Sequence, residues 1–491
     1  MPSVARILVV GLDSADGGLV SRLCDSGELP ALRSLRERGT RGVLKSPLAL
    51  ADDATWASFA TASGPGKHGR YFWRRLRPGT YAMPPFGDAP FGREPFWSAL
   101  SRAGRRVAVI DVPKSPVAIE LNGLQLANWL VHGRDGATRS VPPGLAADVL
   151  ARYGDDSTDR PGTEAWLCRM EPLSANELEP FLERLLTSIE RKAALSAEQL
   201  SHGGWDLFLT VFKESHCAAH QCWHLLDARH PAHDRELGLR LGGPVQRVYR
   251  ALDAALGRLI GLVGTDATVI VFSDLGMGVN DTGEHLLDGV LRRLEWADAS
   301  PLRRARAWLR RRVSPASLRH RRAYQVEHNE ISGAIRVNVK GREPHGSVER
   351  GELDAFYESL TRDLLDLVDP GTGHPIVERV VRVDEEFPGE QRDGLPDLLV
   401  VWRRNAPITG AASPKIGELR VGPPPFRPGN HVADGWFVCA GPTVAPGREI
   451  EPASIMDLGP TIAALLAAGP LEADGTAIAA VSPGAQRNSS P

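Results

Sequence analysis

The sequence predicts an α/β fold with a central, mostly parallel sheet flanked by helices. Short apolar segments alternate with segments of helical spacing over most of the 491 residues, which is typical of layered α/β proteins. The apolar runs are rich in β-branched residues, as expected of parallel strands that are buried on both faces. Two of these runs, at residues 7–10 and 268–273, lead into Asp13 and Asp274. Both carboxylates are expected at the carboxyl edge of the sheet, where open α/β sheets bind ligands.

The other expected elements follow in order along the chain. Residues 19–35 have helical spacing that is interrupted at Pro30, because proline cannot continue a helix without losing a hydrogen bond. Apolar residues recur with helical spacing at 245–263 and again at 455–467, which predicts two more helices. Further apolar runs predict strands at 106–112, 205–212, 333–339, 397–402 and 435–440.

The chain is expected to form one domain over residues 1–479 that carries two insertions, or cap segments. The first, residues 113–204, is rich in turn residues and acidic helical stretches, and the second, residues 280–330, contains an arginine cluster at 303–322. That cluster can contact an anionic surface, but it is also typical of a solvated helix face, which is the interpretation we prefer. Residues 480–491 are polar and rich in proline, glycine and serine, and they predict a disordered tail.

Composition places the chain among ordinary globular proteins. The formal net charge of −2 gives no general attraction to nucleic acid, and no nucleic-acid partner is expected. The five cysteines are scattered and odd in number, which argues against a disulfide framework and favours the reducing cytoplasm. No apolar run is long enough for a transmembrane segment, and the start of the chain lacks the apolar stretch of a secretory signal.

A second group of acidic residues precedes an expected helix. Asp52 and Asp53 stand just before residues 56–61, which can form a helix, and oxygen ligands near a helix start suit a metal or a phosphate site. Taken singly, Asp13 and Asp52 are explained more simply as helix caps. Together with the histidines that follow along the chain, they favour a ligand site.

Three histidines are spaced by one helical turn directly after a predicted strand. His216, His220 and His224 follow the strand that ends at residue 212, and on a helix they share one face. Two imidazoles at this spacing can hold one divalent metal, while a third can support the ligands or the core. His431 stands in a polar loop just before another expected strand, where it is either a further ligand or a surface residue.

Together these segments resemble the alkaline phosphatase superfamily, in particular its type I phosphodiesterase/nucleotide pyrophosphatase branch. The resemblance covers most of the chain and implies an alkaline-phosphatase-like sheet with helices on both sides. It also implies two metals at the carboxyl ends of the strands and a threonine or serine nucleophile. The blocks that carry the resemblance are residues 7–16, 56–69, 220–227, 271–278, 333–344, and 430–435 followed by 456–461.

The resemblance carries four metal ligands over to this chain. They are Asp13, His220, Asp274 and His431. Three other positions depart from the family pattern. The nucleophilic threonine falls on Asp52, the aspartate expected one turn before His220 is His216, and the histidine expected after Asp274 is Leu275.

These departures imply two metal positions of different chemistry. One is rich in carboxylates and suits Mg²⁺, Mn²⁺ or Ca²⁺; the other has three imidazoles and suits Zn²⁺ or another transition metal. Because Leu275 replaces an imidazole, the carboxylate position is expected to bind zinc less tightly. One or two divalent ions, Zn and/or Mn or Mg, are therefore expected. The carboxylate position comprises Asp13, Asp52, Asp274 and, as a further candidate, Asp53, and the other comprises His216, His220 and His431.

We expect a metal-dependent hydrolase of small phosphate esters, with diesters or pyrophosphates before monoesters. Three nucleophiles stay open: Asp52, a water activated by the metal, or the Thr55 hydroxyl; we favour water, because a carboxylate that ligates a metal is a weak nucleophile. Lys67, His68 and Arg342 are candidates for binding the substrate phosphate, although Arg342 can equally fix a turn. Alternatives on the same fold are a non-catalytic metal- or anion-binding member, a sulfatase, and a biosynthetic or transferase enzyme.

Overall fold

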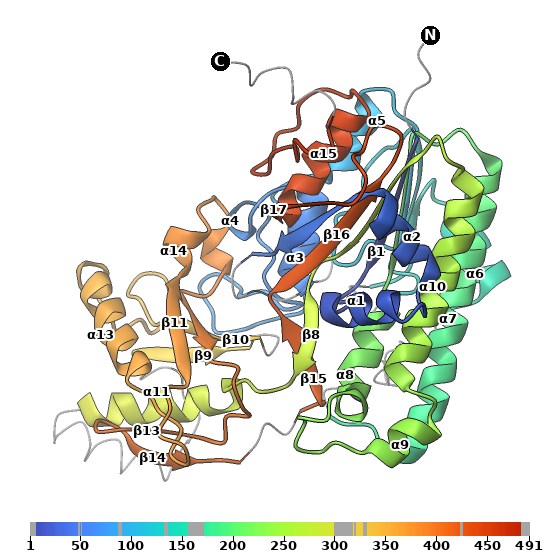
Figure 1. The fold of residues 1–491 in the computed structure, drawn as a ribbon. Helices are drawn as coiled ribbons and strands as arrows, with labels where there is room; N and C mark the ends of the chain where they lie inside the picture. The colour runs from blue at the N-terminus through green and yellow to red at the C-terminus, as the bar shows by residue number, and fades with distance from the viewer. Residues whose placement is uncertain are drawn as a thin grey trace, which may run out of the picture. The chain divides into compact units, whose positions relative to one another are not determined.

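Figure 1 shows the computed structural model, which describes residues 6–47, 50, 52–86, 91–131, 136–155, 171–298, 318, 321–327, 331–422 and 426–482. The chain forms two compact units. The first combines Met1–His68, Gly87–Val279 and Phe426–Pro491, and the second combines Gly69–Phe86 and Asn280–Pro425. The expected domain of residues 1–479 thus comprises two units.

The first unit is built on a nine-stranded sheet with the strand order β17-β2-β16-β7-β1-β6-β3-β4-β5. Its centre is parallel: β1 (Ile7–Leu12) lies between β6 (Leu207–Phe212) and β7 (Thr268–Ser273). The strand β16 (Asp434–Ala440) runs antiparallel to β7. The sheet is nevertheless mostly parallel, as predicted. The remaining strands are β2 (Thr40–Lys45), β3 (Val107–Ile110), β4 (Gly123–Ala127), β5 (Arg139–Val141) and β17 (Arg448–Ser454).

Helices cover both faces of this sheet because its strands are apolar on both sides (Figure 1). Leu8 and Val10 of β1 point into one core, while Ile7 and Val9 point into the other. The first core is covered by α1 (Gly17–Asp25), α2 (Pro30–Arg38), α7 (Ala175–His202), α8 (Glu214–Leu226) and α10 (Pro244–Val263). The second is covered by α3 (Asp52–Thr61), α5 (Phe96–Arg102) and α15 (Leu458–Leu465). The remaining helices of this unit that the structure describes are α4 (Pro65–His68), α6 (Leu145–Tyr153), α9 (Arg235–Arg240) and η5 (Ile455–Asp457).

The strand register brings three chain segments to the same edge of the sheet. Leu12 lies opposite Phe212, and Gly11 lies opposite Phe272, so the residues that follow β1, β6 and β7 emerge together. Gly11 also lets α3 approach β1, because a Cβ at this position would lie 2.9 Å from a Val211 methyl carbon and 3.0 Å from the Trp56 ring.

The segment expected as an insertion, residues 113–204, differs from that prediction. It contributes β4 and β5 to the edge of the main sheet, as well as the long helix α7. The strand β4 pairs in the sheet, where its alternating residues Leu124 and Leu126 enter the same core as α7. The predicted break at Pro30 is confirmed, since α2 begins at this proline.

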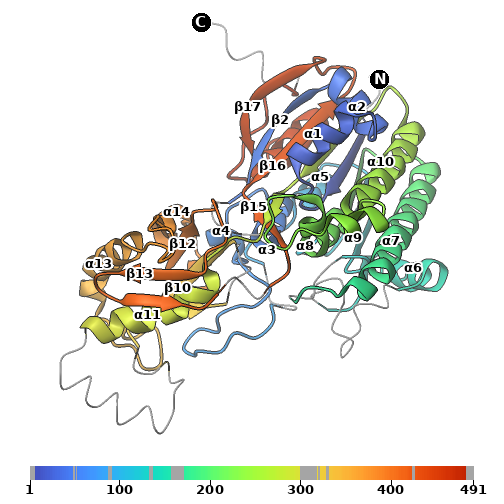
Figure 2. The same ribbon diagram turned by 60° about the horizontal axis from the view of Figure 1, so that its bottom comes forward.

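The second unit has its own four-stranded sheet with the order β11-β12-β10-β9 and its own core. Its strands are β9 (Ala323–Val326), β10 (Ser332–Val337), β11 (Val377–Arg382) and β12 (Leu398–Trp402). Its helices are α11 (Glu284–Asp298), α13 (Leu353–Leu365) and α14 (Val383–Glu386), which Figure 2 labels, with the short η3 (Arg350–Glu352) and η4 (Arg392–Gly394). The strands β13 (Gly410–Ser413) and β14 (Gly417–Arg420) form an antiparallel hairpin.

Two predicted segments fall largely outside the described residues. Most of the arginine cluster at 303–322 and the predicted tail from residue 483 onward belong to this part of the chain. Among the helices that the structure describes, none combines the length and the apolar character that crossing a bilayer requires.

Candidate metal centre

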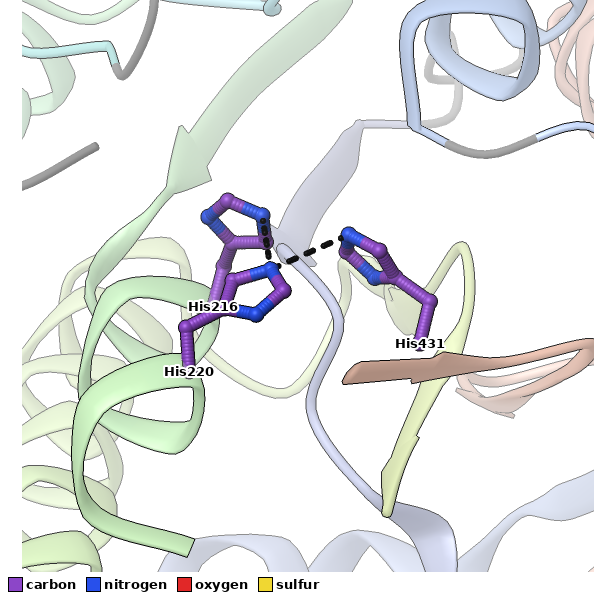
Figure 3. A group of neighbouring side chains, drawn as sticks. All are labelled: His216, His220 and His431. Carbon is purple, nitrogen blue, oxygen red and sulfur yellow. Dashed lines mark hydrogen bonds between the residues drawn. The ribbon is translucent and has the colours of Figure 1, made fainter. Parts of the chain in front are cut away.

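Three buried histidines of the first unit meet at the carboxyl edge of its sheet (Figure 3). His216 and His220 lie one turn apart on α8, which follows β6. His431 comes from β15 (Gly429–Val432), which pairs with β8 (Gly276–Val279) just after β7. The Nε2 atom of His220 is 3.0 Å from Nε2 of His216 and 3.2 Å from Nε2 of His431. Each residue is at most 2% exposed.

Hydrogen bonds at the other ring nitrogens fix how two of these rings are protonated. His220 Nδ1 lies 2.7 Å from the Gly429 carbonyl oxygen, which only accepts, so Nδ1 carries the proton and Nε2 presents a lone pair. The Ser14 hydroxyl donates to Asp13 Oδ1 at 3.1 Å and therefore accepts from His431 Nδ1, also at 3.1 Å. His220 and His431 therefore each present an Nε2 lone pair, and these two Nε2 atoms lie 3.2 Å apart.

Imidazole lone pairs that converge on one place are the arrangement that a metal ion requires. Burial lowers the pKa of His220 well below its ordinary value, and the charge of Arg427 and the neighbouring imidazoles of His216 and His431 lower this pKa further. A neutral imidazole is the form that ligates a metal. The three histidines therefore fit a transition metal such as zinc.

Two aspartates stand next to the histidines, at the ends of β1 and β7. Asp13 and Asp274 are fully buried, and the Ser14 backbone N–H donates to Asp274 Oδ1 at 2.8 Å. Burial raises the pKa of Asp274 well above its usual range, and the nearby Asp13 and Asp52 carboxylates raise it further. Within the described residues, Asp274 Oδ2 is buried with no hydrogen-bond partner. A cation at this position would relieve the repulsion and satisfy this oxygen.

The acidic pair that precedes the expected helix forms its first turn. The helix α3 begins at Asp52, so Asp52 and Asp53 lie at the end where the helix dipole favours negative charge. Asp52 Oδ1 is 4.0 Å from His431 Nε2, and Asp52 is only 5% exposed. Thr55 is also fully buried, one turn further along α3.

The structure gives the predicted phosphate-binding residues other partners. Lys67 forms an ion pair with Asp474 near the surface of the first unit. His68 is buried, and its Nε2 atom is 3.0 Å from Ser58 Oγ. In the second unit, Arg342 holds Asp397 through two hydrogen bonds of 2.6 and 2.7 Å, an arrangement that fixes a turn.

The remaining sequence candidates lie around the cluster rather than in it. His224, one turn beyond His220, has a pKa lowered to about 4 by burial and by neighbouring His230, an effect that Asp234 partly opposes. Leu275 is fully buried, and its carbonyl oxygen accepts a hydrogen bond of 2.7 Å from Ser273 Oγ.

Sequence reasoning missed two hydroxyls and one ammonium. Ser14 connects Asp13, Asp274 and His431, and Ser215 Oγ donates to the Asp13 carbonyl oxygen at 2.7 Å. The only signal in the sequence was that Ser14 and Ser215 adjoin predicted ligands. Lys114, whose Nζ is 3.8 Å from Asp53 Oδ1, gave no signal because it lies in a segment expected as an insertion.

The profile of the family described as type I phosphodiesterase/nucleotide pyrophosphatase matches residues 7–434. The chain belongs to this family. Its members are phosphoester hydrolases of the alkaline phosphatase superfamily, and they depend on divalent metals. The predicted family, fold class and enzyme class are therefore confirmed. No curated protein sequence matches the chain.

Solved structures with the same fold cover this family member almost completely. A structure of murine ectonucleotide pyrophosphatase/phosphodiesterase 5, an inactive form in complex with AMP, has a TM-score of 0.54 at 14% identity, covering 96% of this chain and 97% of that one. Phosphonoacetate hydrolase from Sinorhizobium meliloti 1021, in complex with phosphonoformate, has a TM-score of 0.52 at 16% identity, with coverage of 95% and 96%. At these identities the similarity establishes the fold alone.

Proposed function

We propose that the protein hydrolyses small phosphate esters, diesters or pyrophosphates before monoesters, at a zinc centre held by His216, His220 and His431. The observation that carries this proposal is that the Nε2 atoms of His216 and His431 both lie within hydrogen-bonding distance of His220 Nε2. The ligands named in the neighbouring structures, AMP and phosphonoformate, support a small phosphorylated or phosphonate substrate. Asp13 and Asp274, with Asp52 beside them, would hold a second ion, Mg²⁺ or Mn²⁺.

A divalent metal supplies two things to such a reaction: it polarises the phosphoryl oxygen and lowers the pKa of water. The protein's own groups supply the orientation. The Gly429 carbonyl and the Ser14 hydroxyl fix the rings of His220 and His431, and Ser14 also holds Asp13 and Asp274.

Asp52 replaces the hydroxyl that attacks phosphorus in the family. We propose that the Asp52 carboxylate orients an attacking water and accepts its proton. Its place at the start of α3, where the helix dipole stabilises negative charge, supports this role. The buried Thr55 hydroxyl lies one turn deeper in the helix, which makes it the weaker candidate.

The test is hydrolysis of an aryl phosphodiester, an aryl phosphate monoester and an aryl sulfate, each in Zn²⁺, Mn²⁺ and Mg²⁺. We expect diesterase activity that a chelator abolishes, and a loss of about 100-fold or more in Asp52→Asn. His220→Ala should lose both activity and bound metal. The exposed controls Asp25→Asn and His202→Ala should retain both. A protein that binds zinc but hydrolyses none of the three esters would contradict the proposal and favour a non-catalytic member.

A further inference from the structure

A buried ion pair adjoins the segment of α3 that carries Asp52. Lys114 Nζ lies 3.8 Å from Asp53 Oδ1, and the two side chains are 3% and 6% exposed. Asp53 directly follows Asp52, whose carboxylate oxygen is 4.0 Å from His431 Nε2. The buried ammonium is therefore held by the residue next to the proposed catalytic carboxylate.

The turn that presents Lys114 has an unusual backbone. Asp111 and Lys114 have φ angles of +54° and +52°, in the left-handed region that residues other than glycine rarely adopt. The Asp111 carboxylate accepts hydrogen bonds of 2.9 and 2.7 Å from the backbone N–H groups of Trp129 and Leu130. It also pairs at 3.2 Å with the fully buried ammonium of Lys192. Strained residues that their surroundings hold this firmly are found mainly at functional sites.

Burying a lysine costs free energy unless its charge is paired, as Asp53 pairs the charge of Lys114. The cations that the sequence suggested for phosphate binding have other partners: Lys67 pairs with Asp474, and Arg342 pairs with Asp397. Lys114 is paired too, with Asp53, but it lies beneath the protein surface. It follows β3 at the carboxyl edge of the sheet, where the candidate metal ligands also lie. An ammonium is a compact charge with three donors, which suits a phosphate oxygen.

We infer that Lys114 is a specificity-determining residue that binds a non-bridging oxygen of the substrate's phosphoryl group, with Asp53 holding its ammonium in position. The inference rests on the proposed function, because it concerns the substrate of the same centre. It identifies the substrates as anionic phosphoryl compounds. A site that depends on this charge disfavours uncharged esters, such as carboxylic esters and phosphotriesters.

The test measures binding of inorganic phosphate to the zinc-loaded protein by titration calorimetry, together with KM and kcat for an aryl phosphodiester. Lys114→Met should weaken phosphate binding and raise KM by roughly 10- to 100-fold, with a smaller change in kcat and unchanged zinc binding. Lys114→Arg should recover part of the affinity, because it keeps the positive charge. The control Lys340→Met, which breaks the exposed Lys340–Glu349 pair, should match the wild type.

Removing one member of a buried pair can prevent folding. The double variant Lys114→Met/Asp53→Asn leaves no charged side chain at the position of the buried pair. It should then show the same weakened phosphate binding. Wild-type phosphate affinity in either folded variant would overturn the inference, as would a wild-type protein that takes up zinc but binds no phosphate. A wild-type protein that takes up no zinc contradicts the proposed function instead, and phosphate affinity compared between wild type and variant still tests Lys114.

Discussion

Ser14 is the residue that best explains how the candidate centre is organised. Its backbone N–H holds Asp274, its hydroxyl donates to Asp13, and the same oxygen accepts from His431 Nδ1. Its φ of +50° lies in the left-handed region that residues other than glycine rarely adopt. A small hydroxyl residue in this conformation therefore sets both the ring orientation and the carboxylate orientation.

Ser14→Ala should lower zinc affinity by about tenfold or more, because His431 loses the partner that fixes its tautomer. Competition with a zinc-binding dye measures this affinity. Ser201→Ala, which removes a hydroxyl that donates to the Ala197 carbonyl oxygen on the exposed side of α7, is the matched control. Equal zinc affinity in wild type and Ser14→Ala would show that the hydroxyl does not support the ligands.

At the scale of elements, the centre depends on the close approach of β15 to α8. A Cβ at Gly429 would lie 2.2 Å from the Ala219 carbonyl oxygen, a distance that no side chain tolerates. The carbonyl oxygen of the same glycine accepts a hydrogen bond from His220 Nδ1–H. One glycine therefore sets both the spacing of the two elements and the protonation of a ligand.

Gly429→Ala should push β15 away from α8 and lower both the zinc affinity and the free energy of unfolding, the latter by roughly 1–3 kcal/mol. Chemical denaturation and zinc titration measure the two effects. Gly261→Ala, in α10 where a Cβ meets nothing within 4 Å, should leave zinc affinity unchanged and stabilise the helix by up to about 1 kcal/mol. Wild-type zinc affinity in Gly429→Ala would mean that β15 does not position the centre.

At the scale of the whole molecule, the stability of the metal-free protein should depend on pH. Burial, aided by neighbouring His230, lowers the pKa of His224 to about 4, whereas an unfolded histidine titrates near 6.5. Between these values the unfolded chain binds a proton that the folded protein does not. The contribution of His224 to stability is therefore constant above about pH 6.5 and becomes steadily less favourable as the pH falls toward 4.

Replacing His224 by glutamine should make the free energy of unfolding fall less steeply between pH 6.5 and 4. The experiment compares urea denaturation of the two proteins in the presence of a chelator. Buried carboxylates such as Asp274, whose pKa is raised, contribute a slope of the opposite sign to both proteins. The difference between the two curves therefore isolates His224. Parallel curves for the two proteins would contradict a lowered pKa for His224.

Most strands of the large sheet could be predicted, because buried parallel strands are recognisable in a sequence as short apolar runs. The strands β1, β6 and β7 begin and end within two residues of their predicted limits. The strands β4 and β5 were missed, because Gly123–Ala127 and Arg139–Val141 are short and lie in a segment rich in turn residues. Their place in the sheet is decided by pairing with residues distant in the sequence, which no local pattern records.

For the site, the ends of strands and the one-turn spacing of His216 and His220 were readable signals, and the structure brings both histidines to His431. The contacts of Ser14 and Lys114 were not readable. Ser14 joins groups 260 and 417 residues away, and Lys114 reaches Asp53 of α3 from the turn that follows β3. Such contacts arise from the topology of the sheet rather than from local composition.

The central claim is that three imidazoles hold one metal ion. Crystals of zinc-loaded protein, with diffraction recorded on both sides of the zinc absorption edge, test this most directly. We expect one anomalous peak at about 2.0–2.1 Å from the Nε2 atoms of His216, His220 and His431. An ordered centre without that peak, with the three rings hydrogen-bonded to one another instead, would contradict it.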